Sequence, residues 1–297
     1  SSKKSIFQND LASFGYIYAP KEDKWHISEQ AIDYLYLGKK SLDFEIPGRL
    51  RIISDYKNGI SDFSGLTLFN VSQIDFIPNN EITFLSCKDS DNIFARLKLL
   101  PKCIIVLETD NECAYASLRQ FFIKCMEQKI FNPIIIKRSY NTLSVDDTLI
   151  YAATDIGALQ IDGLGDGVWI NTLHSNSFSN EISFGILQAS RTRISKTEYI
   201  SCPSCGRTLF DLQETTEKIR SKTDHLKGIK IGIMGCIVNG PGEMADADYG
   251  YVGTGPGLIS LYKGQNIVEK NINAENAVAA LIKLIQKHGD WQEPNNV

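Results

Sequence analysis

The chain has 297 residues, a hydrophobic fraction of 43%, a formal net charge of -4 at pH 7 and a pI near 5.7. This acidic balance, without a run of lysine and arginine interleaved with aromatic residues, argues against a nucleic-acid partner. No apolar run approaches the roughly 18 to 20 residues that span a bilayer, so we expect no membrane association. The length and the hydrophobic fraction together predict two domains, each with a packed core.

The seven cysteines, an odd number at low density, are typical of a reducing compartment rather than of a secreted domain held by disulfides. Four of them lie among apolar or helical neighbours without paired spacing: Cys87, Cys103, Cys113 and Cys125. Because a free cysteine behaves as a small hydrophobic residue, we expect all four to be ordinary buried thiols. The other three lie between positions 202 and 236, where two of them are separated by only two residues.

The first 60 residues are the least readable part of the chain, and they suggest only a helix over residues 25–37 and a strand over residues 48–54. From about residue 66, short β-branched apolar runs predict buried strands, at 81–86, 103–108, 133–138, 148–152 and 167–171. Apolar residues at helical spacing predict the helices between and after them, at 91–99, 111–128, 155–160 and 180–193.

A strand followed by a helix, repeated along the chain, predicts parallel strand pairing with right-handed crossovers. We therefore expect residues 1–191 to form an α/β domain that is barrel-like, or an incomplete (β/α) barrel. Within it, the glycine-rich residues 162–167 favour a tight turn over a phosphate-binding loop, because no lysine follows the glycines and no helix starts at once. A polar stretch near residue 192 marks the boundary to a second domain, residues 192–297.

The second domain begins with a predicted strand at 197–201 that ends directly in the pair Cys202 and Cys205. A helix over 208–221 and a strand over 229–234 follow, so that a strand–helix–strand unit returns Cys236 to the edge that carries the pair. A strand at 249–252, a hairpin of strands at 258–262 and 265–270, and a last helix that Gly289 ends complete the domain. We expect a smaller α/β domain with a mixed sheet.

Three kinds of chemistry fit the cysteine pair. A Cys-Pro-x-Cys sequence at a helix N-terminus suits a thiol–disulfide oxidoreductase, because the helix dipole lowers the thiol pKa. A zinc-stabilised docking module is a second possibility, although zinc sites of this spacing usually have two such pairs. Thiolates are also the usual ligands of an iron–sulfur cluster. The spacing of Cys202 and Cys205 alone does not choose among the three.

The loop around Cys236 helps to distinguish among these three kinds of site. It carries several glycines and a proline, so its backbone can approach a bulky ligand, and Glu243 follows seven residues after Cys236. Three cysteines and one carboxylate form an unequal ligand set. A displaceable carboxylate on one iron leaves that iron able to accept a substrate oxygen, whereas a purely structural zinc site is usually closed by better matched ligands. This set therefore favours a catalytic cluster.

Two motifs of the second domain resemble those of a known enzyme family. Residues 202–207 read CPSCGR, and residues 235–243 read GCIVNGPGE. Together they closely resemble the cluster domain of the 4-hydroxy-3-methylbut-2-enyl diphosphate synthase family, which belongs to the non-mevalonate isoprenoid pathway. The resemblance spans about residues 192–297, and the second motif is highly specific.

The resemblance implies a [4Fe-4S] cluster whose ligands are Cys202, Cys205, Cys236 and, on the fourth iron, Glu243, with Asn239 near the substrate. The family reductively opens the ring of 2-C-methyl-erythritol 2,4-cyclodiphosphate and removes a hydroxyl group, which is an oxidoreductase reaction in the synthesis of terpenoid precursors. Ferredoxin or flavodoxin supplies the two electrons one at a time. The location implied is the bacterial cytoplasm or the plastid stroma.

The chain also departs from the family pattern. Family members begin with a catalytic barrel whose arginines and lysine bind the diphosphate, and this sequence lacks such a basic set; its strand after residue 166 carries Trp169 and Asn171 instead of Arg-x-Ser. Residues 1–191 therefore resemble the extra barrel-like domain of longer, plant-type members, and we expect a spacer and docking surface. On this interpretation the N-terminal catalytic barrel is missing, and the chain alone does not turn over.

Overall fold

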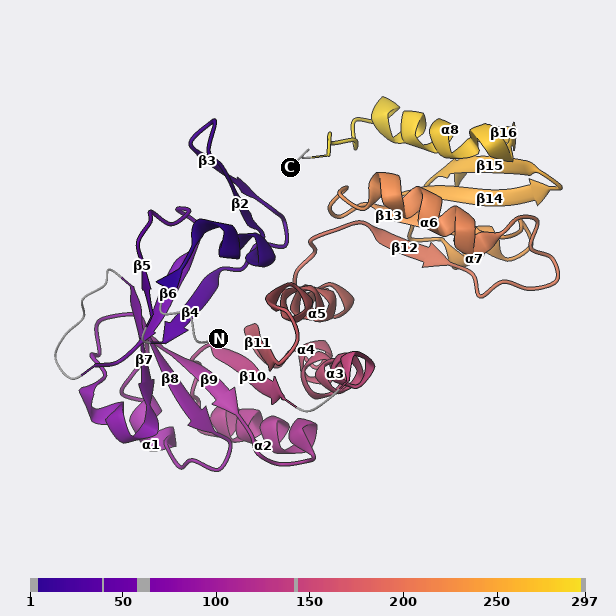
Figure 1. Cartoon of the computed structure of the whole chain (residues 1–297). Helices are drawn as coiled ribbons and strands as arrows, with labels where there is room; N and C mark the ends of the chain where they lie inside the picture. The colour runs from indigo at the N-terminus through magenta and orange to yellow at the C-terminus, as the bar shows by residue number, and fades with distance from the viewer. Residues whose placement is uncertain (1–4, 39, 58–64, 142–143, 295–297) are drawn as a thin grey trace. The chain divides into compact units, whose positions relative to one another are not determined.

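The computed structural model describes residues 5–38, 40–57, 65–141 and 144–294 (Figure 1). The chain divides into two compact units, Ser1–Arg193 and Ile194–Val297, here named unit 1 and unit 2. None of the helices among the described residues is long and apolar enough to cross a membrane.

The core of unit 1 is a seven-stranded sheet in which every pair of neighbouring strands is parallel. The spatial order of its strands follows the sequence, as in a (β/α) barrel. From one edge to the other these are β4 (Tyr34–Gly38), β6 (Arg51–Asp55), β7 (Leu66–Asn70), β8 (Thr83–Lys88), β9 (Cys103–Glu108), β10 (Ile134–Tyr140) and β11 (Gly167–Thr172). The strands predicted near 48–54, 81–86, 103–108, 133–138 and 167–171 are confirmed.

The sheet curls into an incomplete barrel, because side chains from its two edge strands meet. The edge strands of a flat sheet of this size would lie roughly 29 Å apart, at about 4.8 Å for each spacing. Instead, the ring centroids of Tyr36 on β4 and Trp169 on β11 lie 5.0 Å apart. Ile53, Phe84 and Val106 form a small buried cluster on this side of the sheet, against which Trp169 packs. The expected barrel-like α/β architecture of unit 1 is confirmed at this level.

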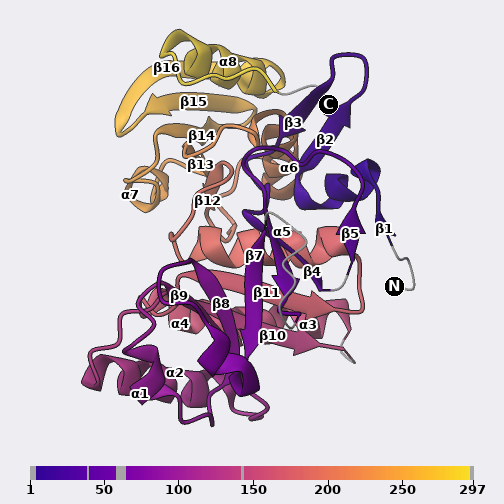
Figure 2. The ribbon, with the colours of Figure 1, turned by 90° about the vertical axis from the view of Figure 1, so that its left-hand side faces the viewer.

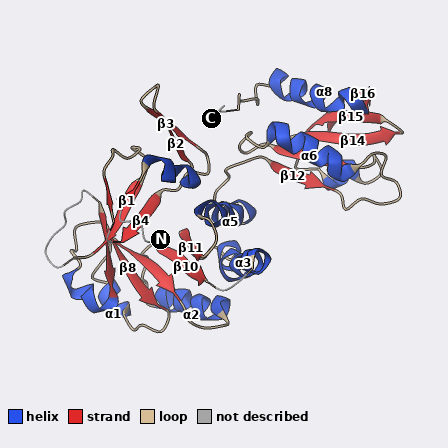
Figure 3. Ribbon diagram, in the orientation of Figure 1, coloured by secondary structure: helices blue, strands red, loops and turns tan. Residues whose placement is uncertain are grey.

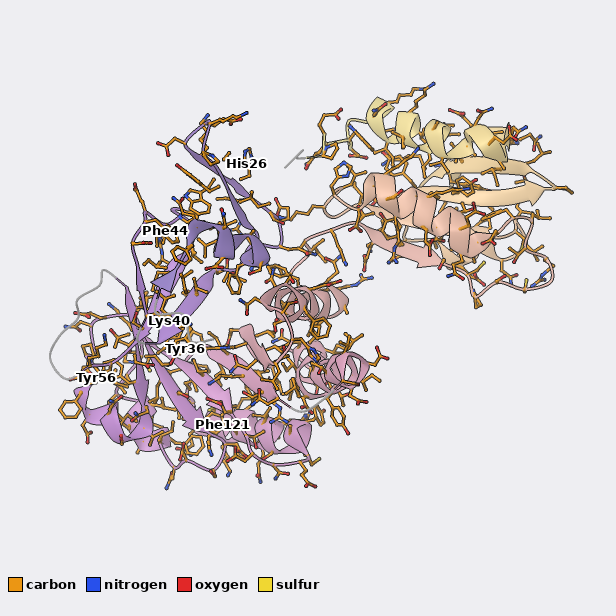
Figure 4. The ribbon with its side chains drawn as sticks, viewed as in Figure 1. His26, Tyr36, Lys40, Phe44, Tyr56 and Phe121 are labelled. Atoms are coloured by element: carbon orange, nitrogen blue, oxygen red, sulfur yellow. The ribbon has the colours of Figure 1, made fainter. Side chains whose placement is uncertain are left out.

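Helices cover the other face of the unit 1 sheet and form the largest core of the molecule with it (Figure 2). They are α1 (Phe94–Leu97), α2 (Ala114–Glu127), α3 (Val145–Ala152), α4 (Ala158–Ile161) and α5 (Asn176–Ala189), with the π-helical turn η3 (Ala153–Gly157) between α3 and α4. Phe121 on α2 is 1% exposed, and its ring lies 5.2 Å from that of Phe94 on α1 (Figure 4). The predicted helices at 91–99, 111–128, 155–160 and 180–193 all correspond to helical segments with shifted ends.

The helix expected over residues 25–37 is wrong. This stretch contains β3 (Lys24–Ile27), which pairs with β2 (Tyr16–Ala19), and the edge strand β4. Leu35 and Leu37 on β4 are 6% and 5% exposed, whereas Tyr34 and Tyr36 are 41% and 39% exposed. This alternation is the period of a strand with one covered face. The remaining short elements of unit 1 are β1 (Ser5–Ile6), β5 (Ser41–Leu42) and the 3-10 helices η1 (Gln8–Phe14) and η2 (Val71–Phe76).

The strand expected over residues 148–152 is also wrong, since these residues belong to α3. Ser144 is the N-cap of this helix, and its hydroxyl accepts a hydrogen bond from the backbone N–H of Asp147 at 3.1 Å. Such a cap satisfies one of the free donors at a helix start. A capping serine followed by acidic residues therefore outweighs the β-branched composition of the run.

The four isolated cysteines do not share one environment. Cys87, Cys103 and Cys125 are buried, as expected, but Cys113 is exposed immediately before α2, so the expectation for Cys113 is wrong. Burial raises the pKa of Cys103 and of Cys125 to about 11. These two thiols are therefore protonated and unreactive at neutral pH.

Unit 2 is a smaller α/β unit with a five-stranded mixed sheet (Figure 3). Its strands, in both spatial and sequence order, are β12 (Glu198–Ser201), β13 (Lys230–Met234), β14 (Tyr249–Gly255), β15 (Leu258–Lys263) and β16 (Asn266–Asn273). The first three strands are parallel, and the last two continue as antiparallel hairpins. The mixed sheet expected here is confirmed.

Two helices pack on one face of the unit 2 sheet, α6 (Leu212–Thr223) and α8 (Ala274–Lys287), and they share one buried cluster with its strands. The short helix α7 (Gly240–Glu243) lies on the other face, where Met244 packs with Met234 and Val252. The last helix ends before Gly289, which has a φ of 78°, as the sequence predicted.

Candidate metal centre

The two cysteine loops leave the same edge of the unit 2 sheet. β12 and β13 are parallel neighbours, with Ser201 opposite Ile233. Cys202 follows β12 directly, and Cys236 follows β13 after one residue, Gly235. Both loops therefore leave from the carboxyl ends of adjacent parallel strands, where α/β sheets commonly bind their ligands.

The first loop holds two thiols in different surroundings. Cys202 is partly buried, and its Sγ accepts a hydrogen bond from the backbone N–H of Gly235 at 3.3 Å. Cys205 is exposed. The helix expected to start near Thr208 begins only at Leu212, seven residues after Cys205, so the pair does not lie at the helix N-terminus that the thiol–disulfide oxidoreductase alternative assumed. Backbone hydrogen bonds to sulfur are a known means of tuning iron–sulfur centres.

Arg207, rather than a helix dipole, lowers the pKa of Cys205. Hydrogen bonds from the backbone N–H of Arg207 and then from its guanidinium lower the pKa of Cys205. The hydrogen bond to Cys205 in turn raises the pKa of Arg207. Coulombic interactions with Cys236 and with Glu243 also raise the pKa of Arg207. One cation thus lies within electrostatic reach of two of the predicted thiol ligands and of the predicted carboxylate ligand.

Glu243 and Asn239 lie at the two ends of α7. The backbone carbonyl of Asn239 accepts the N–H groups of Gly242 and Glu243, each at 3.0 Å. Both the Asn239 and the Glu243 side chains are exposed, and the Asn239 side chain makes no capping hydrogen bond. The next residue, Met244, is 1% exposed and anchors the helix.

Glycine makes this anchoring of α7 possible. A Cβ atom on Gly232 of β13 would lie 2.6 Å from the Cβ atom of Met244, and a Cβ atom on Gly250 of β14 would lie 2.5 Å from its Cε atom. Contacts this short essentially never occur with real Cβ atoms, so Gly232 cannot carry a side chain while Met244 stays in place, and a side chain at Gly250 would displace the flexible end of Met244. Glu243 is thereby held beside the carboxyl ends of the parallel strands.

The donor set fits a cluster better than it fits a single ion. Within the described part of the chain, no three Cys, His, Asp or Glu side chains converge closely enough to hold one metal ion. A four-iron cube separates its ligands by its own width, so its ligands surround a space rather than a point. Parallel pairing of β12 with β13 brings the loops of Cys205 and Cys236 to one sheet edge, and α7 carries Glu243 as an exposed side chain. A Cβ atom added to Gly206 or Gly242 would meet no atom within 4 Å, so both loops border open space.

Two residues beside the predicted ligands make contacts that the sequence does not predict. Arg207 is the last residue of the CPSCGR motif, and Thr208, which follows the motif, is predicted to be the first residue of a helix. The available signal was the position of Arg207, two residues after a predicted thiolate ligand, because a guanidinium so close to a thiol lowers its pKa.

Comparisons with known proteins agree with the motif-based resemblance. Residues 198–287 match the GcpE protein C-terminal domain. A protein of Parabacteroides distasonis is 42% identical over 267 residues, which are 87% of this chain and 43% of the relative. Its name is 4-hydroxy-3-methylbut-2-en-1-yl diphosphate synthase (flavodoxin).

Proteins of two other bacteria carry the same name. The one from Protochlamydia amoebophila is 49% identical over 201 residues, 68% of this chain and 30% of the relative. The one from Leptospira interrogans is 53% identical over 166 residues, 55% of this chain and 25% of the relative. The chain thus spans less than half the length of these curated relatives. Residues 198–287 are thus similar to the C-terminal domain of the GcpE protein, and over most of its own length the chain is similar to proteins named 4-hydroxy-3-methylbut-2-en-1-yl diphosphate synthase (flavodoxin).

Proposed function

We propose that unit 2 holds a [4Fe-4S] cluster through Cys202, Cys205 and Cys236, with Glu243 as the ligand of the fourth iron. The cluster serves the reductive ring opening and dehydroxylation of 2-C-methyl-erythritol 2,4-cyclodiphosphate, with flavodoxin or ferredoxin as the electron donor. The observation that carries this proposal is the parallel pairing of β12 with β13, which brings the loop of Cys202 and Cys205 and the loop of Cys236 to one sheet edge, where the Gly235 N–H donates to the Cys202 thiol. The names of the relatives supply the product and the flavodoxin, whereas the substrate and the ring opening are implied by the motif resemblance.

The residues of the site have distinct tasks under this proposal. When bound, a [4Fe-4S] cluster supplies low-potential electrons one at a time. The lowered pKa of Cys205 keeps its thiolate form available for metal binding. Glu243, a hard and exposed carboxylate, is a weaker partner for iron than a thiolate and is therefore the exchangeable one. Asn239 presents an exposed amide beside that carboxylate for the oxygen atoms of the substrate.

Unit 1 is proposed to act as a spacer and docking surface. The diphosphate group of the substrate is bound, on this proposal, by a catalytic barrel that corresponds to the part of the relatives not matched by this chain. Two predictions follow for the 297-residue chain: it takes up the cluster, and it does not convert the cyclodiphosphate. Turnover by this chain alone would contradict the second prediction without affecting the first.

The test is anaerobic purification of the 297-residue chain after reconstitution with iron and sulfide. We expect close to four iron and four sulfide per chain, which is the composition of this cluster, and an electron paramagnetic resonance signal after dithionite reduction. Stoichiometric zinc without labile sulfide, in a chain that is fully folded, would contradict the proposal and favour the zinc-stabilised docking module.

Single replacements localise the cluster. Cys205→Ser and Cys236→Ser should each remove most of the bound iron, because serine is a poor substitute for a thiolate ligand. Cys113→Ser is the matched control, since Cys113 is an exposed thiol of unit 1. It should retain the iron content of the unchanged chain, and a loss as large as that of Cys205→Ser would contradict the assignment.

A thiol–disulfide oxidoreductase remains the second candidate, because one observation favours it. Cys205 is exposed and has a lowered pKa, as the attacking thiol of such enzymes has. This function predicts reduction of a disulfide substrate by the metal-free chain and no dependence on Cys236. Loss of that activity in Cys236→Ser, or its absence in the metal-free chain, would contradict it.

A further inference from the structure

Thr208 joins the loop of Cys202 and Cys205 to the loop of Cys236. Its hydroxyl Oγ1 accepts a hydrogen bond from the backbone N–H of Cys205 at 3.0 Å. Its own backbone N–H donates to the carbonyl of Cys205 at 2.9 Å. Thr208 therefore forms hydrogen bonds with both the backbone N–H and the backbone carbonyl of Cys205.

Thr208 also packs closely against Gly235 in the loop that carries Cys236. A Cβ atom on Gly235 would lie 2.7 Å from Cγ2 and 2.8 Å from Oγ1 of Thr208. On the other side, a Cβ atom on Gly253 would lie 2.5 Å from the carbonyl oxygen of Gly235, and Leu209 donates its backbone N–H to that oxygen at 3.0 Å. The backbone just before Cys236 is thus enclosed between Thr208 and β14.

Thr208 also supports an unfavourable backbone conformation between the two cysteines. Ser204 has a φ of 65°, in the left-handed region that non-glycine residues rarely adopt. The Ser204 and Thr208 hydroxyl oxygens lie 3.2 Å apart, within hydrogen-bond distance. Thr208 therefore stabilises the turn between Cys202 and Cys205 through its contacts with Ser204 and Cys205.

We propose that Thr208 is a positioning residue for the cluster. It holds the Cys205 turn against Gly235, whose N–H donates to the Cys202 thiol, so that the two loops keep a fixed separation. Because Cys205 is exposed, water can replace the Thr208 hydroxyl as a partner of its N–H, and folding does not depend on this bond. The role is specific to cluster retention. This inference rests on the proposed iron–sulfur function.

The experiment compares two replacements in the anaerobically reconstituted 297-residue chain. Thr208→Val keeps the shape of the side chain but removes the hydroxyl, and Thr208→Ser keeps the hydroxyl. The readout is the rate at which iron is released to a ferrous chelator, together with the line shape of the reduced paramagnetic signal. We expect release about fivefold to tenfold faster in Thr208→Val, the factor that corresponds to one lost hydrogen bond, and within about twofold of the unchanged chain in Thr208→Ser.

Thr216→Val is the matched control, because Thr216 lies on α6 and its hydroxyl donates to the carbonyl of Leu212. It should release iron at the unchanged rate. A second variant approaches the same contact from the other side: Gly235→Ala must displace Thr208, and it should accelerate release at least as much as Thr208→Val. The thermal unfolding midpoint of the metal-free chain should be nearly the same for Thr208→Val and Thr208→Ser.

The outcomes separate the two proposals. Equal iron release from the unchanged chain and from Thr208→Val would overturn the positioning role and leave the proposed function intact. Equally fast release from Thr208→Val, Thr208→Ser and Thr216→Val would also overturn it, because the effect would then be a general loss of stability. If the unchanged chain takes up no cluster, the proposed function fails and this inference fails with it.

Discussion

The two units use the carboxyl ends of their parallel strands in different ways. In unit 1 the polar side chains there bind one another. The hydroxyl of Tyr36 donates to Asp55 at 2.7 Å. Glu108 accepts a hydrogen bond from Ser86 at 3.0 Å and pairs with Lys137 at 2.7 Å.

In unit 2 the corresponding edge carries groups that act on one cation instead. Cys205, Cys236 and Glu243 all raise the pKa of Arg207. The carboxyl edge of a (β/α) sheet is where such folds usually place their chemistry. Polar groups that satisfy one another favour a structural role, whereas exposed or partly buried thiols and an exposed carboxylate on loops beside one sheet edge favour a bound ligand. We therefore propose that unit 2 carries the chemistry and that unit 1 supports it.

The largest effect is expected where unit 1 buries a charge. The Nε atom of Arg138 and the Tyr140 hydroxyl both donate to Asp155, which is 6% exposed, at 3.0 and 2.9 Å. Arg138→Met leaves that carboxylate without its cation and should lower the free energy of unfolding by about 3 kcal/mol. Urea unfolding followed by circular dichroism measures the change.

The control for this replacement is Arg119→Met, since Arg119 forms an exposed ion pair with Asp162. Exposed pairs contribute little to stability. Equal destabilisation by the two replacements would show that burial of the Arg138 pair is unimportant. Iron uptake by unit 2 should be the same in both variants.

The next effect concerns the exchangeable ligand in unit 2. Glu243→Ala should leave a cluster that assembles without oxygen but is lost in air about tenfold faster, because three thiolates remain and the fourth iron has no protein ligand. Bleaching of the visible absorbance measures this rate. Glu214→Ala, an exposed change on α6, is the control and should bleach at the unchanged rate. Bleaching of Glu243→Ala at that same rate would argue against Glu243 as a ligand.

A smaller effect is expected at the mouth of the incomplete barrel. Tyr36→Phe removes the hydrogen bond to Asp55 but keeps the ring contact with Trp169. The free energy of unfolding of unit 1 should fall by about 1 kcal/mol. Tryptophan fluorescence during urea unfolding provides the measurement. A change in iron uptake by this variant would contradict the purely structural role of these polar groups.

The smallest effect is a pH-dependent one in unit 2. Hydrogen bonds from Tyr249 and then Lys263 lower the pKa of Asp290, a partly exposed residue. A carboxyl group whose pKa is lowered on folding stabilises the fold above its ordinary pKa and loses that contribution on acidification. Asp290→Asn should therefore reduce stability at pH 7, by less than about 1 kcal/mol given its exposure.

The difference between Asp290→Asn and the unchanged chain should fade as the pH falls below about 3.9, the ordinary value for aspartate. Thermal unfolding at a series of pH values measures it. A difference that grows with acidification would have the opposite sign and would rule out this ion pair as its cause.

Local patterns were sufficient for the elements whose periodicity agrees with their environment. The strand at Cys103–Glu108 has its predicted bounds, and the last helix ends before Gly289 as predicted. Both elements contribute residues to the large buried clusters of their units. The tight turn at residues 162–167 is also observed, with Gly163 and Gly165 at positive φ.

The predictions of secondary structure were wrong for short segments whose structure depends on other parts of the fold. Residues 34–37 form a strand because they pair with β6, which follows only at Arg51 and is not apparent from their local pattern. Residues 148–152 form a helix because the Ser144 cap outweighs their strand-like composition. Propensity is a weak guide when tertiary contacts decide which surface of a short segment is buried.

For the candidate centre, the sequence by itself determined which residues are predicted to carry the chemistry: the motifs name Cys202, Cys205, Cys236 and Glu243 as ligands by resemblance. Only the tertiary structure decided what surrounds them. Parallel pairing of β12 with β13 places the two loops at one edge, and the contact between Thr208 and Gly235 joins them. The physical reason is that ligand identity is a property of single residues, whereas their separation depends on contacts between segments distant along the chain.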